Sequence, residues 1–376
     1  MYYYLILIFS VILFFFYIYI KIKYKFWLKQ PVFQYYNIYY WIYPNGIIEK
    51  NIPKINIKFY DLNLKFSKIS ELNNKDKMLV HCLINQNYLK NRKIKYNPSF
   101  KDIFEYFNNT NSYISLKYSI TGGLIGCITS KNLLCFKDNI KRNINYVDFL
   151  CVRKSERKKG IAEKLIYTHY IKTRKINICP VSLFKREGKQ NLIVPLVKYK
   201  AYGYDIKFKN ILYDNNFKTN NLKYILINTS NIKSLYHYLN IIKNKFKFFI
   251  MPDMNNIYNQ IKNNILIIGL VLRNNIPICI YLFRNAKTYY NNKSSIECFG
   301  SYYSLNERYF INGFSNIIKL INNKFDIILI ENISYNDIII NKILKKENIL
   351  WKVNMGYYFY NYVAHTINNN NILIIT

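Results

Sequence analysis

One short basic loop in this chain has the residue types and spacing to hold a phosphorylated ligand. Residues 157–162 read R-K-K-G-I-A, the pattern R-x-x-G-x-A, between an apolar run at 144–152 that predicts a strand and a helical pattern that begins at about Ile161. The glycine lets the backbone approach a ligand closely, and the unpaired first amides of the helix favour an anion. We therefore predict a diphosphate cradle, with an ordinary solvated basic loop as the alternative. Its candidate residues are Arg157, Lys158, Lys159, Gly160, Ile161 and Ala162.

The segment before this loop resembles a signature of the N-myristoyltransferases. Residues 149–152 read F-L-C-V and are followed by Lys154 and Arg157, similar to the family's run F-L-C-V-H-K-x-L-R-S-K-R-x-A-P. The family is a two-lobed branch of the wider acetyltransferase (GNAT) superfamily, whose R-x-x-G-x-A form Gly160 restores. The resemblance implies that the amides of Phe149 and Leu150 form an oxyanion hole. It also implies an acyl-CoA site that includes Phe149, Leu150, Cys151 and Val152. The sequence departs from the signature at Arg153, Glu156, Lys158, Gly160 and Glu163.

A second segment, residues 24–32, reads Y-K-F-W-L-K-Q-P-V and is similar to the family's K-F-W-x-T-Q-P-V. The resemblance implies that it covers the acyl-CoA. Phe26 and Trp27 would offer aromatic surface to the adenine or pantetheine, with Lys25 near a phosphate. Aromatic packing within the protein is the alternative. The cofactor-binding candidates here are Tyr24, Lys25, Phe26 and Trp27.

Three further segments resemble the family's peptide-binding side. Residues 83–88, L-I-N-Q-N-Y, resemble L-L-N-E-N-Y; Tyr96-x-Pro98-x-Phe100 resembles Y-S-P-E-F; residues 354–362, N-M-G-Y-Y-F-Y-N-Y, resemble N-L-Q-Y-Y-L-Y-N-W. The family follows the first segment with an acidic run that receives basic peptide residues, whereas this chain reads L-K-N-R-K at 89–93. We therefore expect a preference for peptides with neutral or acidic residues after the glycine. The substrate-binding candidates are Tyr88, Lys90, Arg92, Lys93, Tyr357 and Tyr358.

The candidate base is the free end of the chain. In this family the C-terminal carboxylate takes a proton from the amine of the substrate, and family members end a similar distance after Y-N-W. Here the last five residues, I-L-I-I-T, form an apolar tail that fits a buried end, although a strand that merely packs is the alternative. Thr376 is the candidate, through its α-carboxylate. We read Cys151 as a small buried residue and His169 as a surface or packing residue, and no Ser-His-Asp or Cys-His arrangement can be assembled.

Composition excludes several classes of protein. The net charge is +35, with 55 Lys and Arg against 20 Asp and Glu, but the lysines are scattered and no nucleic-acid-binding motif occurs. We therefore expect no nucleic-acid partner. The 7 cysteines form no C-x-x-C pair and the 4 histidines have no ligand spacing, so we predict neither disulfides nor a metal site and expect a reducing compartment.

The N-terminus predicts a membrane span. Residues 2–20 carry no charge, and nineteen residues at a rise of ~1.5 Å each cover ~29 Å, about one hydrocarbon core. No basic start or cleavage site of a signal peptide is present. Lys21, Lys23, Lys25 and Lys29 follow directly, so the catalytic domain should be cytosolic and lie against the membrane. A hydrophobic helix packed inside the protein is the alternative.

The remaining patterns predict an α/β (α+β) fold with two fused acyltransferase-like lobes behind one transmembrane helix. In the first half we expect a hairpin at 112–118 and 124–130, and a strand at 176–184; residues 185–235, where the family's histidine is absent, are hard to interpret. The second half repeats the order strands, helix, strand, helix, strand. We predict an anchor at 1–23, an acyl-CoA-binding lobe at 24–210 and a peptide-binding lobe at 211–376. The second-half elements are expected at 265–273, 277–284, 296–304, 310–321, 325–331, 338–344 and 357–363.

Together these features predict a monomeric, membrane-anchored protein N-acyltransferase. The resemblance implies transfer of a myristoyl-type group from myristoyl-CoA to the N-terminal glycine of proteins. One alternative is another acetyl- or acyl-CoA-dependent N-acetyltransferase, which the second lobe and the 24–32 segment disfavour. Another is a non-catalytic acyl-CoA- or peptide-binding homologue, which the missing histidine and the inverted charge at 89–93 favour.

Overall fold

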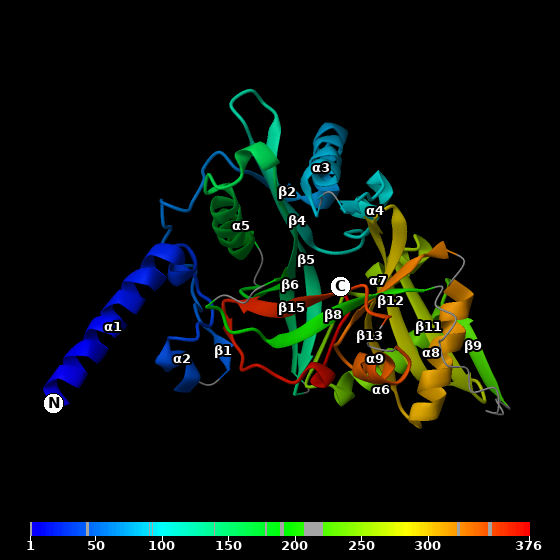
Figure 1. Cartoon of the computed structure of the whole chain (residues 1–376). Helices are drawn as coiled ribbons and strands as arrows, with labels where there is room; N and C mark the ends of the chain where they lie inside the picture. Colours follow the sequence, from blue (N-terminus) through cyan, green and yellow to red (C-terminus); the bar gives the residue numbers. More distant parts are fainter. Residues whose placement is uncertain are drawn as a thin grey trace.

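The computed structural model is an α/β fold built around one large sheet (Figure 1). It describes residues 2–42, 45–89, 91, 93–138, 140–176, 179–188, 192–206, 221–321, 324–344 and 348–376. In this part of the chain the sheet has 15 strands. Twelve lie side by side in the order β17 (Ile372–Ile374), β10 (Phe248–Met251), β5 (Leu124–Lys137), β6 (Ile140–Val152), β7 (Ser182–Glu187), β15 (Trp351–Tyr360), β8 (Val197–Asp205), β14 (Ile327–Glu331), β13 (Lys293–Tyr303), β12 (Ile276–Tyr290), β11 (Leu266–Arg273) and β9 (Leu222–Leu226).

Shorter elements extend this sheet or lie beside it. The strand β4 (Ser112–Tyr118) pairs with β5 and with β2 (Lys65–Lys68), and β3 (Ile94–Tyr96) pairs with β12. Away from the sheet, β1 (Gly46–Ile47) pairs with β16 (Tyr362–Val363). The short α-helices beside the sheet are α2 (Ile38–Ile42) and α4 (Phe100–Glu105), and short 3-10 turns include Trp27–Lys29 and Lys154–Glu156.

Two helices cover opposite faces of the first-half strands. On β4, Ile114 and Leu116 pack in one apolar cluster with Leu83 and Ile84 of α3 (Asn74–Asn87). Ser115 lies between them and therefore points to the other face, where its hydroxyl is 2.8 Å from His169 of α5 (Ile161–Ile176). The alternation along one strand thus places α3 and α5 on either side of the sheet.

The second half is layered in the same way. On β11, Ile268 and Leu270 belong to the cluster formed with α6 (Ile232–Ile242) and α7 (Met254–Lys262), whereas Val271 belongs to the cluster with α8 (Glu307–Ile321) and α9 (Asn336–Lys342). The helix predicted at 310–321 is confirmed, and one of its faces is buried against the sheet. The buried side chains of this face are Phe310, Phe314, Ile317, Ile318 and Ile321.

Strands from the two halves interleave at the middle of the sheet. β15 lies between β7 and β8, and β10 lies next to β5 although their sequences are far apart. One continuous sheet therefore contains strands from both predicted lobes. The division of the chain at residue 210 stays a prediction, and residues 207–220 lie outside the described part of the chain.

Most predicted elements are confirmed, and one is wrong. The hairpin at 112–130, the helix that begins at Ile161 and the order of elements in the second half are all observed. The strand predicted at 176–184 begins only at Ser182, because α5 continues to Ile176. Tyr167, Tyr170 and Ile171 recur at helical spacing and bury one face of α5, and this burial outweighs the β-branched residues near its end.

The apolar N-terminal segment forms α1 (Tyr2–Lys23), which projects from one end of the fold (Figure 1). Ile20 is the buried residue of this helix, so α1 does not pack inside the described protein. Among the described helices, α1 is the one long and apolar enough to cross a membrane.

Candidate active site

The strand that carries the F-L-C-V signature is interrupted by a β-bulge. Asp148 and Cys151 of β6 pair with Thr129 and Cys127 of β5, so two β6 residues stand opposite Ile128 alone. The two are Phe149 and Leu150, the predicted oxyanion donors, and Phe149 has φ +43°. A bulge turns backbone groups away from regular pairing, which is the local geometry that an oxyanion hole requires.

One of these two amides already has a partner. The N–H of Phe149 donates to Oδ1 of Asp148 at 2.8 Å. Burial raises the pKa of Asp148, while this hydrogen bond and the charges of Arg284 and Lys131 lower it in part. This contact was not predicted from the sequence. Because it occupies the Phe149 N–H, the backbone N–H of Leu150, a residue whose side chain lies at the surface, is left as the candidate donor.

Aromatic rings gather around Phe149. Ring centroids lie 5.5 Å away for Tyr88, 6.3 Å for Tyr96, 6.2 Å for Tyr106 and 6.0 Å for Phe107. The segments at 83–88 and 96–100, noted for their resemblance to peptide-binding motifs, therefore meet the signature strand. Tyr88 is the predicted substrate-binding residue that lies at this place.

The basic loop ends at the N-terminus of α5 with an open glycine. Gly160 has φ +74° and a Cβ placed there would meet nothing within 4 Å, so the backbone is accessible from outside. Lys158 also has a positive φ, of 66°. Ile161 and Ala162 begin α5, whose first amides lie at this end. The backbone and the helix end thus fit an anion site.

The side chains of the loop are less free than the sequence suggested. The Arg157 guanidinium donates from Nε to the carbonyl of Val152 at 3.1 Å and from Nη2 to that of Asn87 at 2.7 Å. Arg157 therefore joins the loop to β6 and α3, and these two bonds compete with any role on phosphate. Lys159 pairs with Glu156 at 3.0 Å.

The aromatic segment at 24–32 packs against the signature helix. The Phe26 ring is buried, 5.2 Å from that of Phe59, and is enclosed by protein rather than open to a ligand. The Trp27 ring remains partly exposed and stacks on Phe184 at 6.1 Å, which in turn stacks on Tyr358 at 5.4 Å. Of the four cofactor-binding candidates in this segment, Trp27, the partly exposed Tyr24 and the exposed Lys25 are therefore still accessible.

Two neighbouring tyrosines predicted to bind the peptide point to opposite faces of β15. Tyr358 belongs to the aromatic cluster of Phe26 and α5. Tyr357 faces the other side, where its ring stacks on Tyr199 at 5.9 Å. The two side chains therefore cannot both line one site. Only Tyr357 lies near the buried ionisable groups around Lys185 and Glu331. Lys90 and Arg92 lie outside the described residues, and Lys93 is exposed just before β3.

The end of the chain is buried beside a buried arginine. β17 runs parallel to β10, the Ile375 N–H donates to the Ile250 carbonyl at 2.8 Å, and Thr376 is buried. Nη2 of Arg284 donates to the terminal oxygen of Thr376 at 3.0 Å. The buried terminus predicted from the apolar tail is therefore observed.

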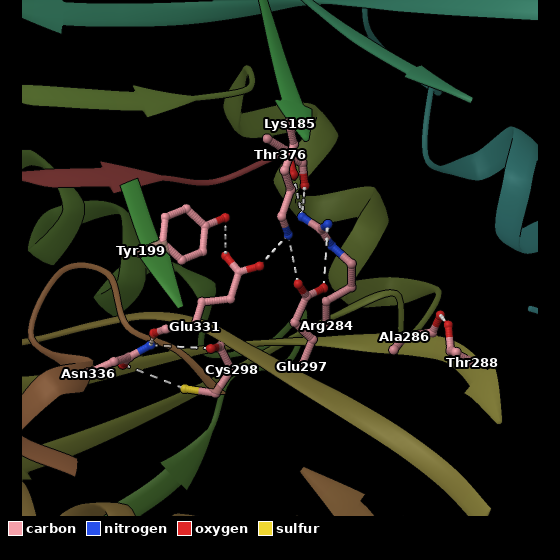
Figure 2. A network of polar contacts seen from close by, with 10 residues as sticks. All are labelled: Lys185, Tyr199, Arg284, Ala286, Thr288, Glu297, Cys298, Glu331, Asn336 and Thr376. Atoms are coloured by element: carbon pink, nitrogen blue, oxygen red, sulfur yellow. Dashed lines mark hydrogen bonds and ion pairs between the residues drawn. The ribbon is translucent and has the colours of Figure 1, made fainter. Parts of the chain in front are cut away.

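Arg284 connects the terminus to a chain of charges (Figure 2). Its Nη1 lies 3.9 Å from Oε2 of Glu297, whose Oε1 accepts from Lys185 at 2.9 Å. Lys185 also pairs with Glu331, which accepts a hydrogen bond from the Tyr199 hydroxyl at 3.1 Å. Basic and acidic side chains alternate along this network, and such pairing stabilises charges that are far from water.

The network favours the neutral form of one of its carboxyls. Burial raises the pKa of Glu331, Lys185 lowers it in part, and the charge of Glu297 raises it again. Burial acts on Glu297 in the same direction, but Lys185 and Arg284 outweigh it and lower the pKa of Glu297. Of the two carboxyls, Glu331 is therefore the one that more readily holds a proton, while Arg284 and Lys185 favour the charged form of Glu297.

Tyr106 joins the bulge to the terminus. Its ring packs on Phe149, and burial and the charge of Asp148 raise its pKa, while Arg284 and then Thr376 oppose the increase. Nζ of the fully buried Lys131 lies 3.5 Å from the centre of the same ring. Burial lowers the pKa of Lys131 well below its ordinary value. Tyr106 thus lies between Phe149 of the bulge and Thr376, and the joint role of Phe149, Leu150 and Thr376 stays a prediction.

The sequence analysis missed most of the ionisable groups at this site. They are Lys131, Asp148, Lys185, Arg284, Glu297 and Glu331. The sequence does contain a sign of such groups, namely a charged residue inside or at the end of an apolar strand pattern. Glu331 in 325–331 and Arg284 in 277–284 are examples, because a charge in a buried strand is usually paired.

His169 is a packing residue and not a surface one. Its Nδ1 is 2.8 Å from the Ser115 hydroxyl and its Nε2 is 2.8 Å from that of Ser130. Burial lowers the pKa of His169 to about 3, so the ring is neutral. Cys151 is buried, as expected, and the described residues contain no group of three or more His, Cys, Asp or Glu that could hold a metal ion.

Solved structures of known enzymes share this fold. Two are Saccharomyces cerevisiae N-myristoyltransferase with bound myristoyl-CoA. One has a TM-score of 0.71 at 17% identity and covers 92% of this chain and 94% of its own; the other has 0.71 at 14%, covering 92% and 91%. A third, with myristoyl-CoA and inhibitors, has 0.72 at 16% and covers 93% of each. The sequence matches no family model and no protein with a curated description. The chain has the N-myristoyltransferase fold, which confirms the resemblance at that level.

Proposed function

We propose that this protein is an N-acyltransferase that moves a myristoyl group from myristoyl-CoA to the N-terminal glycine of proteins. The observation that supports the proposal is that Tyr106 lies between the 149–150 bulge and the buried Thr376, on an N-myristoyltransferase fold. A thioester carbonyl placed at the bulge would be within reach of both a backbone donor and a carboxylate.

The chemistry follows from these two groups. The Thr376 carboxylate takes a proton from the substrate ammonium, and the free amine attacks the thioester carbonyl. The Leu150 N–H donates to the oxyanion that develops, a contact typically worth ~2.7–4 kcal/mol. The new C–N bond forms, the C–S bond breaks, and CoA leaves as the thiolate, which accepts the second proton that the nitrogen loses, so that the products are the amide and the CoA thiol. Arg284 orients the carboxylate, and the open Gly160 and the α5 terminus receive the diphosphate of CoA.

The proposal includes the membrane anchor. α1 would span the bilayer with its lysine-rich end and the catalytic body in the cytosol, where acyl-CoA is found. We further propose that the protein acts as a monomer, with the first lobe at 24–210 binding acyl-CoA and the second at 211–376 binding peptide.

A direct test is acyl transfer by the full chain in lipid vesicles. We expect turnover of a glycine-initiated octapeptide with myristoyl-CoA, little with acetyl-CoA, and none when the peptide amine is acetylated beforehand. Faster transfer from acetyl-CoA, or transfer to the lysine side chains of the blocked peptide, would contradict the proposal and support the N-acetyltransferase alternative.

One observation favours a second candidate, a non-catalytic acyl-CoA-binding homologue. The Phe149 N–H is occupied by Asp148, so half of the expected oxyanion hole is taken. If the full chain binds myristoyl-CoA in calorimetry but shows no turnover with any glycine-initiated peptide, this second candidate is the correct one.

A further inference from the structure

A short helix near the anchor exposes almost all of its apolar surface. No residue of α2 (Ile38–Ile42) is buried, and Ile38 is 73% exposed and Ile42 80%. Tyr39 and Trp41 are exposed as well, with Trp41 tied back to the fold by its ring N–H, which donates to the Tyr35 carbonyl at 3.0 Å. Contiguous exposed apolar surface of this kind marks an interaction site.

The exposed surface of α2 is one apolar tip, and a second apolar tip lies in the loop that precedes β2. Ile57 is 87% exposed and Leu62 85%. Between them the loop is firmly held, because Phe59 packs on Phe26 with ring centroids 5.2 Å apart and the Asp61 N–H donates to the Thr168 hydroxyl at 2.9 Å. The two apolar side chains are therefore presented outward by an ordered loop.

Both tips flank the end of α1. Phe26, which holds the second tip, follows α1 within three residues, and the Gln34 side chain donates to the Trp27 carbonyl at 2.8 Å, which ties the start of the first tip to the same turn. Figure 1 shows α2 and the projecting α1 at the same end of the fold.

Exposed lysines gather between the tips. Lys58 lies close enough to Lys25 that contact with this second ammonium lowers the pKa of Lys58, with Lys29 adding to the effect. Like charges held together are stabilised by an anion, and the cytoplasmic leaflet supplies anionic headgroups at the depth where an apolar tip enters. Tyr and Trp also favour this interface.

We propose that α2 and the 55–62 loop insert their apolar side chains into the headgroup region of an anionic bilayer, with Lys25, Lys29 and Lys58 on lipid phosphates. This inference rests on the proposed span of α1. With α1 as the only contact, the rest of the protein could tilt on the membrane. Three contacts, through α1, α2 and the 55–62 loop, would fix the orientation of the proposed acyl-CoA site relative to the membrane.

Tryptophan quenching by brominated lipids tests the contact. The full chain is placed in phosphatidylcholine vesicles, with or without phosphatidylserine, whose acyl chains carry bromine. Comparison with Trp41→Phe isolates the Trp41 signal. We expect Trp41 to be quenched, more strongly with phosphatidylserine, and Ile38→Glu with Ile42→Glu to abolish most of that quenching.

Controls separate this inference from the anchor itself. Leu305→Glu, at a residue 57% exposed in the second half of the chain, should leave the quenching unchanged. A chain that floats with vesicles while Trp41 stays unquenched would overturn the α2 contact, leave α1 as the sole tether and assign the patch to a protein partner. A chain that does not float with vesicles would overturn both.

Discussion

The loop at 153–162 and the buried terminus at Thr376 are two opposite ways of building a site. The loop is continuous in sequence, exposed, and defined by backbone geometry at Gly160 and the α5 terminus. The terminus depends on side chains from four strands, paired over long separations such as Arg284 with Thr376 and Lys185 with Glu331. A contiguous site tolerates changes to single side chains, whereas an alternating ion network does not, because each removal leaves a buried charge.

Among side-chain substitutions, the largest effect is expected at Arg284. Arg284→Gln should lower kcat about 10²-fold, because the carboxylate loses the group that orients it, while the affinity for myristoyl-CoA stays unchanged. Arg284→Lys should recover part of the rate and show a shifted pH profile, since the charge returns without the planar fork. Single-turnover assays with calorimetry measure both.

Arg273→Gln is the matched control, since Arg273 is an exposed arginine at the end of β11. If folded Arg284→Gln protein turns over as fast as the native chain, the ion network has no part in catalysis.

A smaller effect is expected at the loop. Gly160→Val should weaken CoA binding about tenfold, or ~1.4 kcal/mol, because the side chain would stand where the diphosphate approaches. Gly188→Val is a matched control for backbone strain, since Gly188 has φ +95° and equally open space around its Cβ. Equal CoA affinities of the two variants would remove the phosphate assignment from this loop.

The smallest effect concerns the protonated carboxyl. Since the pKa of Glu331 is raised in the folded state, its contribution to stability is complete below its ordinary value of 4.5 and is lost as the pH rises through the higher folded value. Glu331→Gln cannot ionise, so its free energy of unfolding should fall less than that of the native chain between about pH 5 and 9. Urea denaturation at several pH values measures this, and parallel pH profiles would show that Glu331 is ionised in the native protein.

The sequence predicted what is encoded locally. The turn at Gly160, the helix start at Ile161 and the apolar tail before Thr376 depend on neighbours within a few residues, so their patterns are visible. The strand predicted at 176–184 was wrong in its start, because α5 extends to Ile176 and the strand begins only at Ser182. The role of Phe26 on the cofactor stays a prediction, although its ring is enclosed by Phe59 and other aromatic residues from distant parts of the chain.

The ion network could not be predicted for the same reason. A lone Glu331 in an apolar strand indicates that a partner exists but not which one, and Lys185 lies 146 positions earlier in the chain (331 − 185). The Asp148 carboxylate on the Phe149 amide was missed although the two are adjacent, because it depends on the bulge in β6.

The central claim is that the α-carboxylate of Thr376 is the base, and replacing it alone tests this most directly. A semisynthetic chain that ends in a carboxamide keeps every residue and the β17 pairing, and removes only the charge that accepts the proton. Single-turnover transfer to a glycine-initiated peptide should fall ~10²–10⁴-fold while myristoyl-CoA binds as before. A carboxamide chain that transfers the acyl group at the native rate would contradict the account and move the base to an internal residue, of which the buried Lys131 is the first to examine.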